Sequence, residues 1–406
     1  MKRLLHPPGR AKLDFLLFEN YHIAQNHKMD VLIIAKMLKS QGLDVAIFDI
    51  YHEDKEDIIE GIPVLHWASR ALVPDDTWML RKHTLLETII KSMKFQWQQH
   101  RYMQEVKTFI IDKADNFYCG SYHNGMSTVL FNIQKPCYWW GLRSERFRFS
   151  LRKMLPSPFF GLHILKERSM FLRNSFQRLF VSNNIILEEH VKLGIPRDRM
   201  LIREERCIES KGSPQYDNLS QSFSLLTIGQ LRPDKRVEYT IREFSQCNNE
   251  YKYVLAGTSL GSYETEISTA IDGHDNIIRI NKYLEYSDFN RLISESHFVL
   301  LADKRQRGSV TNGTMMEAFI NHRPIIAPNY DPYKYYVEKY DVGILYNPSM
   351  NGDLAKAINK ANQLGCRHFE KQIDMFLDTL LFDKLSQLLV LDLNRKQGGE
   401  CPIVAK

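Results

Sequence analysis

Two loops in the second half of the chain carry residues that could bind phosphate. The first loop, residues 229–236, follows the apolar run 223–228 and holds Gly229 and three cations within five positions, of which Arg232 and Lys235 are the candidate phosphate ligands. Lysine and arginine N–H groups form charge-assisted hydrogen bonds to phosphate oxygens, so this loop predicts a clamp for a pyrophosphate group. An exposed turn whose charges face only water remains the alternative interpretation.

The second loop, residues 307–318, lies at the start of a predicted helix. Its small and hydroxyl residues would let backbone N–H groups and threonine oxygens approach an anion at the positive helix end. The candidate ligands here are Ser309, Asn312, Gly313 and Thr314. Thr314 and Glu317 also have the spacing of a capping box, in which Glu317 hydrogen-bonds its own N-cap. The capping box is the structural alternative to a phosphate site, and the two interpretations do not exclude each other.

Both loops fall between alternating strands and helices. Residues 223–364 contain six apolar runs, each followed by a helical pattern, at 223–228, 251–256, 276–280, 298–302, 324–327 and 343–346. This alternation predicts a doubly wound parallel sheet. The first half opens with a strand at 13–19, a helical pattern over 31–38 and a strand at 44–50, which predicts a second parallel α/β sheet. Ligands of such sheets bind at the carboxyl ends of the strands.

The fold class is therefore α/β, with two Rossmann-like doubly wound domains facing a cleft. Residues 209–222 are polar, lack apolar periodicity and predict a linker. We expect the segments to be 1–208 for the first domain, 209–222 for the linker, 223–365 for the second domain, 366–393 for a C-terminal helix that crosses back, and 394–406 for a tail.

Composition narrows the class of protein. The chain has 406 residues, a net charge of +6 and 44% hydrophobic residues, as expected for a soluble globular protein of two or three domains. No run reaches the roughly 18 apolar residues of a membrane span. The first residues are basic, but prolines interrupt them before an apolar signal region forms, so we expect an unprocessed cytoplasmic protein. Neither a zinc-binding spacing, a G-x-G-x-x-G loop nor a P-loop is present.

The excess charge is concentrated in one segment. Residues 143–178 carry nine basic and two acidic residues, interleaved with aromatic side chains. Such a mixture suits an anionic membrane surface or an amphiphilic anionic ligand. A basic surface helix with an aromatic core face is the alternative. No nucleic-acid recognition motif accompanies the segment, so nucleic acid is not an expected partner.

The two loops, in this order on alternating elements, resemble the donor-binding domain of GT-B glycosyltransferases of the family 4, or group 1, type. That family has a G-R-x-x-x-x-K-G-like turn for the pyrophosphate of a sugar nucleotide. Gly229 and Lys235 match it, whereas Gln230 stands in place of the arginine and Arg236 in place of the last glycine. Arg232 is our candidate substitute for the missing arginine.

The family's second motif is E-x7-E. Glu317 corresponds to its second glutamate, which the resemblance assigns to the ribose hydroxyls, and Ser309 stands at the first position. The segment from 276 through Tyr283 resembles the family's strand and loop beside the nucleobase. The resemblance extends over about 223–364 and is only architectural in the first half.

The resemblance implies a metal-independent hexosyltransferase without cofactors, and the lack of a D-x-D pair agrees with this. Its donor would be a UDP- or GDP-linked sugar held by the second domain. The first domain would hold a glycan or polyprenyl-pyrophosphate-linked acceptor for cell-envelope polysaccharide (capsule, O-antigen or exopolysaccharide). Within this reading, Arg143, Arg146, Arg148, Arg152 and Lys153 form an acceptor or membrane patch, and the protein would lie peripherally on the inner face of the cell membrane.

An inverting reaction would need a general base on a loop of the first domain. His123, His22 and Glu19 are the candidates, although a polar loop residue without a catalytic role is the favoured interpretation of each. A retaining reaction needs no such base. Two further hypotheses stay open: a sugar-nucleotide epimerase of the same fold, and a degenerate transferase that only binds a partner, suggested by Gln230 and Ser309.

Overall fold

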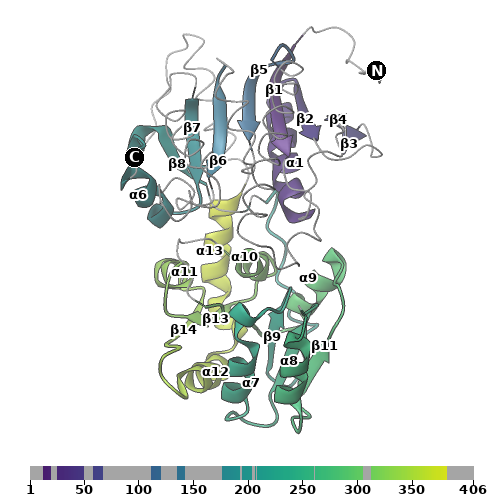
Figure 1. Ribbon diagram of the computed structural model, residues 1–406, viewed down its shortest axis with the longest axis vertical. Coiled ribbons are helices and arrows are strands. Elements are labelled where there is room, and N and C mark those ends of the chain that lie inside the picture. Colours follow the sequence, from purple (N-terminus) through teal and green to yellow (C-terminus); the bar gives the residue numbers. More distant parts are fainter. Residues whose placement is uncertain are drawn as a thin grey trace, which may run out of the picture. The chain divides into compact units, whose positions relative to one another are not determined.

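The computed structural model divides the chain into two compact units, one within residues 1–209 and one over residues 210–381 (Figure 1). Each is described by itself. The structure describes residues 12–19, 25–49, 58–66, 111–119, 135–141, 176–192, 194–203, 206, 208–259, 261–304 and 312–381.

The first unit is built on an eight-stranded sheet in the order β3-β4-β2-β1-β5-β6-β7-β8. Its strands are β1 Leu13–Glu19, β2 Val45–Asp49, β3 Ile58–Ile59, β4 Ile62–His66, β5 Ala114–Cys119, β6 Cys137–Gly141, β7 Phe176–Val181 and β8 Met200–Ile202. All neighbours are parallel except β3 and β4. The described helices are α1 Gln25–Ser40 and α6 Asn184–Lys192, with a 3-10 turn η4 at Arg197–Arg199.

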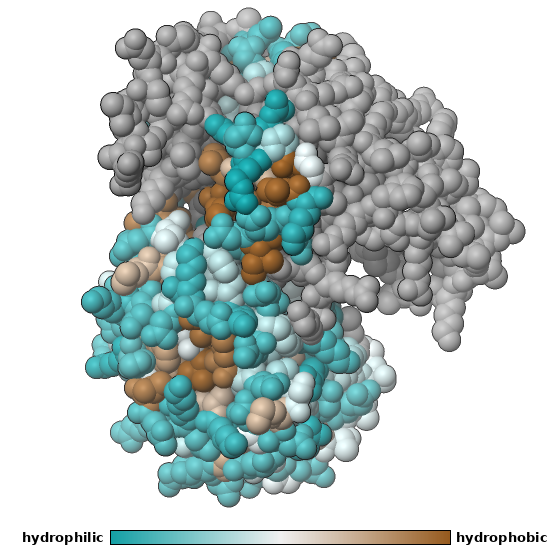
Figure 2. Space-filling view, turned by 90° about the vertical axis from the view of Figure 1, so that its left-hand side faces the viewer, coloured by the Kyte–Doolittle hydropathy of each residue, from teal (hydrophilic) through white to brown (hydrophobic). Residues whose placement is uncertain are grey.

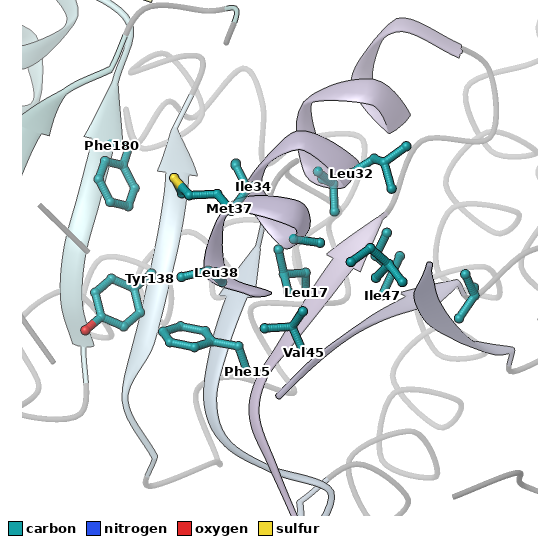
Figure 3. Packing of buried hydrophobic residues seen from close by; sticks show 14 residues of the cluster. Phe15, Leu17, Leu32, Ile34, Met37, Leu38, Val45, Ile47, Tyr138 and Phe180 are labelled. Atoms are coloured by element: carbon teal, nitrogen blue, oxygen red, sulfur yellow. The ribbon is translucent and has the colours of Figure 1, made fainter. Parts of the chain in front are cut away.

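The core of this unit forms where α1 covers the sheet (Figure 3). Val31, Ile34 and Leu38 recur at helical spacing, and all three are buried. Phe15 of β1 packs against Tyr138 of β6, with ring centroids 5.7 Å apart. The strand, helix and strand expected at the start of the chain are thus present.

The second unit contains a six-stranded, all-parallel sheet in the order β11-β10-β9-β12-β13-β14. The strands are β9 Ser224–Ile228, β10 Lys252–Ala256, β11 Ile277–Ile280, β12 Phe298–Leu300, β13 Ile325–Pro328 and β14 Gly343–Tyr346. The helices that follow them are α7 Val237–Phe244, α8 Tyr263–Ile271, α9 Tyr286–Ser294, α10 Gly313–Ile320, α11 Tyr333–Tyr340 and α12 Asp353–Leu364. The expected doubly wound fold is confirmed, and its strand order reverses between β9 and β12.

Residues 210–222, where we expected a linker, are held against the second unit by side chains of the turn after α10. The imidazole Nε2 of His322 lies 2.6 Å from the Gly212 carbonyl oxygen. The buried Arg323 has its guanidinium 5.1 Å from the centre of the Tyr216 ring. These contacts come from a turn distant in sequence, so the polar composition of the segment did not signal them.

The C-terminal helix is shorter than expected within the described part of the chain. A 3-10 turn, η6 Cys366–Phe369, precedes α13 Glu370–Leu380, so the helix begins after residue 366. Phe376 of α13 packs against Phe319 of α10, with ring centroids 5.2 Å apart, which anchors α13 in the second unit. Residues 382–393 of the expected helix and the tail 394–406 lie outside the described residues.

Across the residues that the structure describes, no helix combines the length and apolar character needed to cross a bilayer. On the face shown in Figure 2, the surface of the second unit is mainly hydrophilic, with smaller apolar areas between the polar side chains.

Candidate functional site

The two loops singled out in the sequence flank the reversal of strand order in the second unit. One follows β9 and the other follows β12, which are neighbours in the sheet. A Cβ atom on Gly229 would lie 3.8 Å from both the Lys235 Nζ and the Thr314 Oγ1. The two loops therefore converge on Gly229, where the absent side chain leaves space between a cation and a hydroxyl group. In open parallel sheets this is the place where ligands bind.

The position of Gly229 depends on a second glycine. The Gly229 N–H donates to the Ala256 carbonyl at the end of β10, at 3.0 Å. A Cβ on Gly257 would lie only 2.0 Å from the Gly229 carbonyl oxygen, and Gly257 has a φ of +119°. Any side chain at this position would displace the loop after β9. Our sequence reasoning missed Gly257, although its place directly after a predicted strand was the available signal.

The cations of the first loop differ in how far they are already engaged. Arg232 donates from Nε and Nη2 to the two carboxylate oxygens of Asp234, each at 3.0 Å. Among the residues that the structure describes, the hydrogen-bond contact of Lys235 Nζ is a long one, 3.5 Å to the Ile228 carbonyl oxygen. Lys235 belongs to a 3-10 turn, η5 Pro233–Lys235, that ends before α7. Lys235 is therefore the less neutralised of the two cations, and Arg232 would have to leave its carboxylate to reach a ligand.

Arg236, at the position of the family's last glycine, also adopts a backbone that suits glycine. Its φ is +50°, in the left-handed region that costs a non-glycine residue about 1 kcal/mol or more. Its guanidinium carbon lies 4.2 Å from the centre of the Tyr239 ring on α7, within cation–π distance. The side chain thus packs on its own helix.

The second loop ends in a helix cap that differs from the expected one. Asn312 is the N-cap of α10, and its Oδ1 accepts hydrogen bonds from the Thr314 N–H at 2.9 Å and the Met315 N–H at 3.4 Å. The predicted capping box, with Thr314 as N-cap and Glu317 bonded back to it, is wrong because the N-cap is Asn312, two residues earlier, and α10 begins at Gly313. The Thr314 and Met315 amides are engaged by the cap, so Thr314 offers its hydroxyl rather than its amide.

Glu317 instead faces the element that follows β11. Its side chain is 3% exposed, and its Oε2 accepts a hydrogen bond of 3.3 Å from the Tyr286 hydroxyl. Tyr286 is the first residue of α9. Tyr283, in the loop before this helix, is 69% exposed. The β11 side thus combines the exposed Tyr283 ring with a hydrogen-bonded pair of a tyrosine and a buried carboxylate, and Tyr286 is a residue that the sequence reasoning missed.

A buried carboxylate lies behind the second loop. Asp303 follows β12 and is 7% exposed; its Oδ2 accepts hydrogen bonds from the Tyr333 hydroxyl at 2.7 Å and from Asn312 Nδ2 at 3.0 Å. Burial, and then the neighbouring Asp303, raise the pKa of Tyr333 well above its ordinary value. Asp303 could have been noticed from its place after a strand, whereas nothing in the sequence pointed to Tyr333.

Other expected site residues lie outside the described part of the chain. These are His22, His123, Ser309, Arg143, Arg146, Arg148, Arg152 and Lys153. Glu19 is the last residue of β1, at the carboxyl end of that strand, but its side chain is not described. The candidates for a general base and for the acceptor or membrane patch therefore stay predictions.

Part of the chain matches a known protein family. Residues 222–363 match the family model described as "Glycosyl transferases group 1". No curated protein sequence matches the chain.

Three solved structures share its fold. HepE of Anabaena in complex with UDP has a TM-score of 0.67 at 12% identity, covering 94% of this chain and 100% of HepE. Sucrose-phosphate synthase of Thermosynechococcus elongatus has a TM-score of 0.66 at 12% identity, covering 95% of this chain and 99% of the synthase. The lipopolysaccharide outer core galactosyltransferase WaaB has a TM-score of 0.60 at 13% identity, with coverages of 95% and 99%. The resemblance to GT-B glycosyltransferases of the group 1 type is confirmed.

Proposed function

We propose that this chain, with a group 1 glycosyl transferase match over residues 222–363 and a GT-B fold, transfers a sugar from a nucleoside diphosphate sugar to a glycan or lipid-linked acceptor. The observation that carries the proposal is the convergence of Lys235 Nζ and Thr314 Oγ1 on Gly229, each 3.8 Å from its missing Cβ. A diphosphate placed there would meet a cation and a hydroxyl donor at the reversal of the sheet.

The chemistry follows from the charge that develops in the reaction. The bond between the sugar carbon and the diphosphate oxygen breaks while the acceptor oxygen bonds to that carbon, and negative charge grows on the departing diphosphate. The proton of the acceptor hydroxyl passes to a general base in an inverting reaction, or to the departing diphosphate in a retaining one. Lys235 and the Thr314 hydroxyl would stabilise this charge as it forms. Loss of one such preorganised donor typically raises the barrier by about 3 kcal/mol, or about a hundredfold in rate. Because these groups supply the stabilisation, we propose that no metal ion is needed.

The nucleoside would lie toward β11. Glu317, with its carboxylate buried beside Tyr286, would accept hydrogen bonds from the ribose hydroxyls. The exposed ring of Tyr283 would lie against the base. Uridine is the first base to test, because HepE structures hold UDP and UDP-glucose; a guanosine donor is the alternative.

The test compares Lys235→Ala and Glu317→Ala with Lys356→Ala, which removes an exposed lysine on α12. Calorimetry with UDP and GDP measures affinity, and thermal unfolding confirms the fold. We expect both site variants to lose turnover and to bind a diphosphate at least tenfold more weakly, while Lys356→Ala behaves as wild type. Wild-type activity in both site variants would refute the site.

Two outcomes would favour the other hypotheses. Conversion of the donor sugar to its epimer without an acceptor would indicate an epimerase. Absence of affinity for any nucleoside diphosphate in the wild type would favour a degenerate binding protein. Two observations justify this test: Gln230 and Ser309 replace family residues, and Arg232 is paired with Asp234.

We further propose an acceptor from cell-envelope polysaccharide assembly, carried on polyprenyl pyrophosphate, and a cytoplasmic protein that attaches peripherally to the inner membrane face. The support is the net charge of +7 over residues 143–178, interleaved with aromatic residues. Co-sedimentation with vesicles should rise with their content of anionic lipid. If vesicle binding changes neither with the content of anionic lipid nor on replacement of Arg146 and Arg148 by alanine, these residues do not form a membrane patch.

A further inference from the structure

The buried carboxylate of Asp303 controls which way the Asn312 side-chain amide faces. A carboxylate only accepts hydrogen bonds, so the group of Asn312 that lies 3.0 Å from Asp303 Oδ2 is its NH2 group. The same Nδ2 lies 2.8 Å from the Tyr333 hydroxyl oxygen. A flipped amide would bring two oxygens together at this point. Asn312 Oδ1 must therefore point the other way, toward the first turn of α10.

Tyr333 completes this arrangement as a permanent donor. Its pKa is raised well above the ordinary value by burial and by Asp303, so its hydroxyl stays protonated and donates to Asp303 Oδ2 at 2.7 Å. Burying a carboxylate is unfavourable unless hydrogen bonds replace the lost water. The two donors from Tyr333 and Asn312 meet that requirement for Asp303.

The same short segment also holds the first loop. Lys304, the residue after Asp303, donates its backbone N–H to the Asp234 carbonyl oxygen at 2.6 Å. Asp234 lies in η5, next to Lys235. Residues 303–304 thus contact the turn that carries Lys235 on one side and, through Asn312, the helix that carries Thr314 on the other.

We propose that Asp303 and Tyr333 are positioning residues for the diphosphate site: through the amide of Asn312 they set the first turn of α10, and so the place of Thr314 Oγ1 relative to Lys235. The inference rests on the proposed function. The observation that carries it is the set of hydrogen bonds that joins Asp303, Asn312 and Tyr333, which come from three separate segments. This set contacts the two segments whose groups, Lys235 Nζ and Thr314 Oγ1, converge on Gly229. Neither side chain needs to touch the ligand.

The experiment uses full-length Asp303→Asn and Tyr333→Phe variants, with Tyr335→Phe as matched control on the same helix. UDP and GDP affinities are measured by calorimetry well below each unfolding midpoint, so that only folded protein is compared. Asp303→Asn removes the charge that fixes the amide and should weaken diphosphate affinity about tenfold; Tyr333→Phe should weaken it by a few fold. Backbone hydrogen exchange at Thr314 should become faster in both, and Tyr335→Phe should change neither quantity.

The double variant adds a test of the shared pathway. If both residues act through the same amide, it should lose little more affinity than Asp303→Asn alone. A lower unfolding midpoint with wild-type affinity in both single variants would reduce the network to a structural role and overturn the inference. If Asp303→Asn does not fold, the affinity of Tyr333→Phe decides. A wild type that binds neither diphosphate would instead refute the proposed function itself.

Discussion

Replacing Gly257 by alanine should displace the loop after β9, which carries Gly229 and Lys235, without removing a proposed ligand-binding group. The new methyl carbon would lie 2.0 Å from the Gly229 carbonyl oxygen, whereas ordinary van der Waals contact begins at 3.4 Å. The atom in the way belongs to the backbone, so no side-chain rotation relieves the overlap. The loop after β9 must move by about 1.4 Å, and Gly229 moves with it.

Two effects add in this variant. Alanine at a φ of +119° is strained, at a cost of about 1–3 kcal/mol. Overpacking against fixed atoms typically costs about 1–3 kcal/mol more. For a unit of this size, each kcal/mol lowers the midpoint by about 2–4 °C, so we expect a fall of about 12 °C. Displacement of a binding group by about 1 Å costs on the order of a hundredfold in rate.

Gly273→Ala is the matched control, because Gly273 has a φ of +80° and no atom within 4 Å of its Cβ position. It reports backbone strain alone, and its midpoint should fall by about 6 °C with unchanged diphosphate affinity. Thermal unfolding and calorimetry with UDP and GDP measure both quantities. Equal midpoints for the two variants, together with wild-type affinity for Gly257→Ala, would refute the argument that Gly257 holds Gly229 in place.

Three further outcomes can be checked on the same protein. Arg232→Ala should reduce diphosphate affinity less than Lys235→Ala, because the Arg232 guanidinium is already paired with a carboxylate; calorimetry ranks the two. The hydrogen bond from Arg279 lowers the pKa of Glu264 below its ordinary value of 4.5. The contribution of the Glu264–Arg279 pair to stability is therefore present above pH 4.5 and is lost as the pH falls further. In chemical unfolding, Glu264→Gln should lose less stability over this acidic range than the wild type. Burial lowers the pKa of His190 below its ordinary value of 6.5, so the contribution of the neutral imidazole to the stability of the first unit is present above pH 6.5 and is lost on acidification. His190→Gln should therefore reduce the loss of stability that chemical unfolding measures as the pH falls below 6.5.

The sequence predicted the local order of the second unit well. The apolar runs that became β9, β12 and β13 are buried along their whole length in the parallel sheet, and such strands stand out between helical patterns. Gly229, Lys235 and Thr314 were identified because each lies directly after a strand or at the start of a helix. Prediction of the cap failed because Asn312 and Thr314 both suit an N-cap, and the choice between them depended on Asp303 and Tyr333.

By itself, the sequence determined which residues are candidates for a phosphate site and which strands precede them, since hydrophobic periodicity and motif spacing are local properties of the chain. Only the tertiary structure decided which of these residues meet. The reversal of strand order between β9 and β12 brings Lys235 and Thr314 to Gly229, and the approach of Gly257 and the contact of Tyr333 with Asp303 join residues that no sequence spacing relates. Such contacts depend on how whole elements pack, which is a global property of the fold.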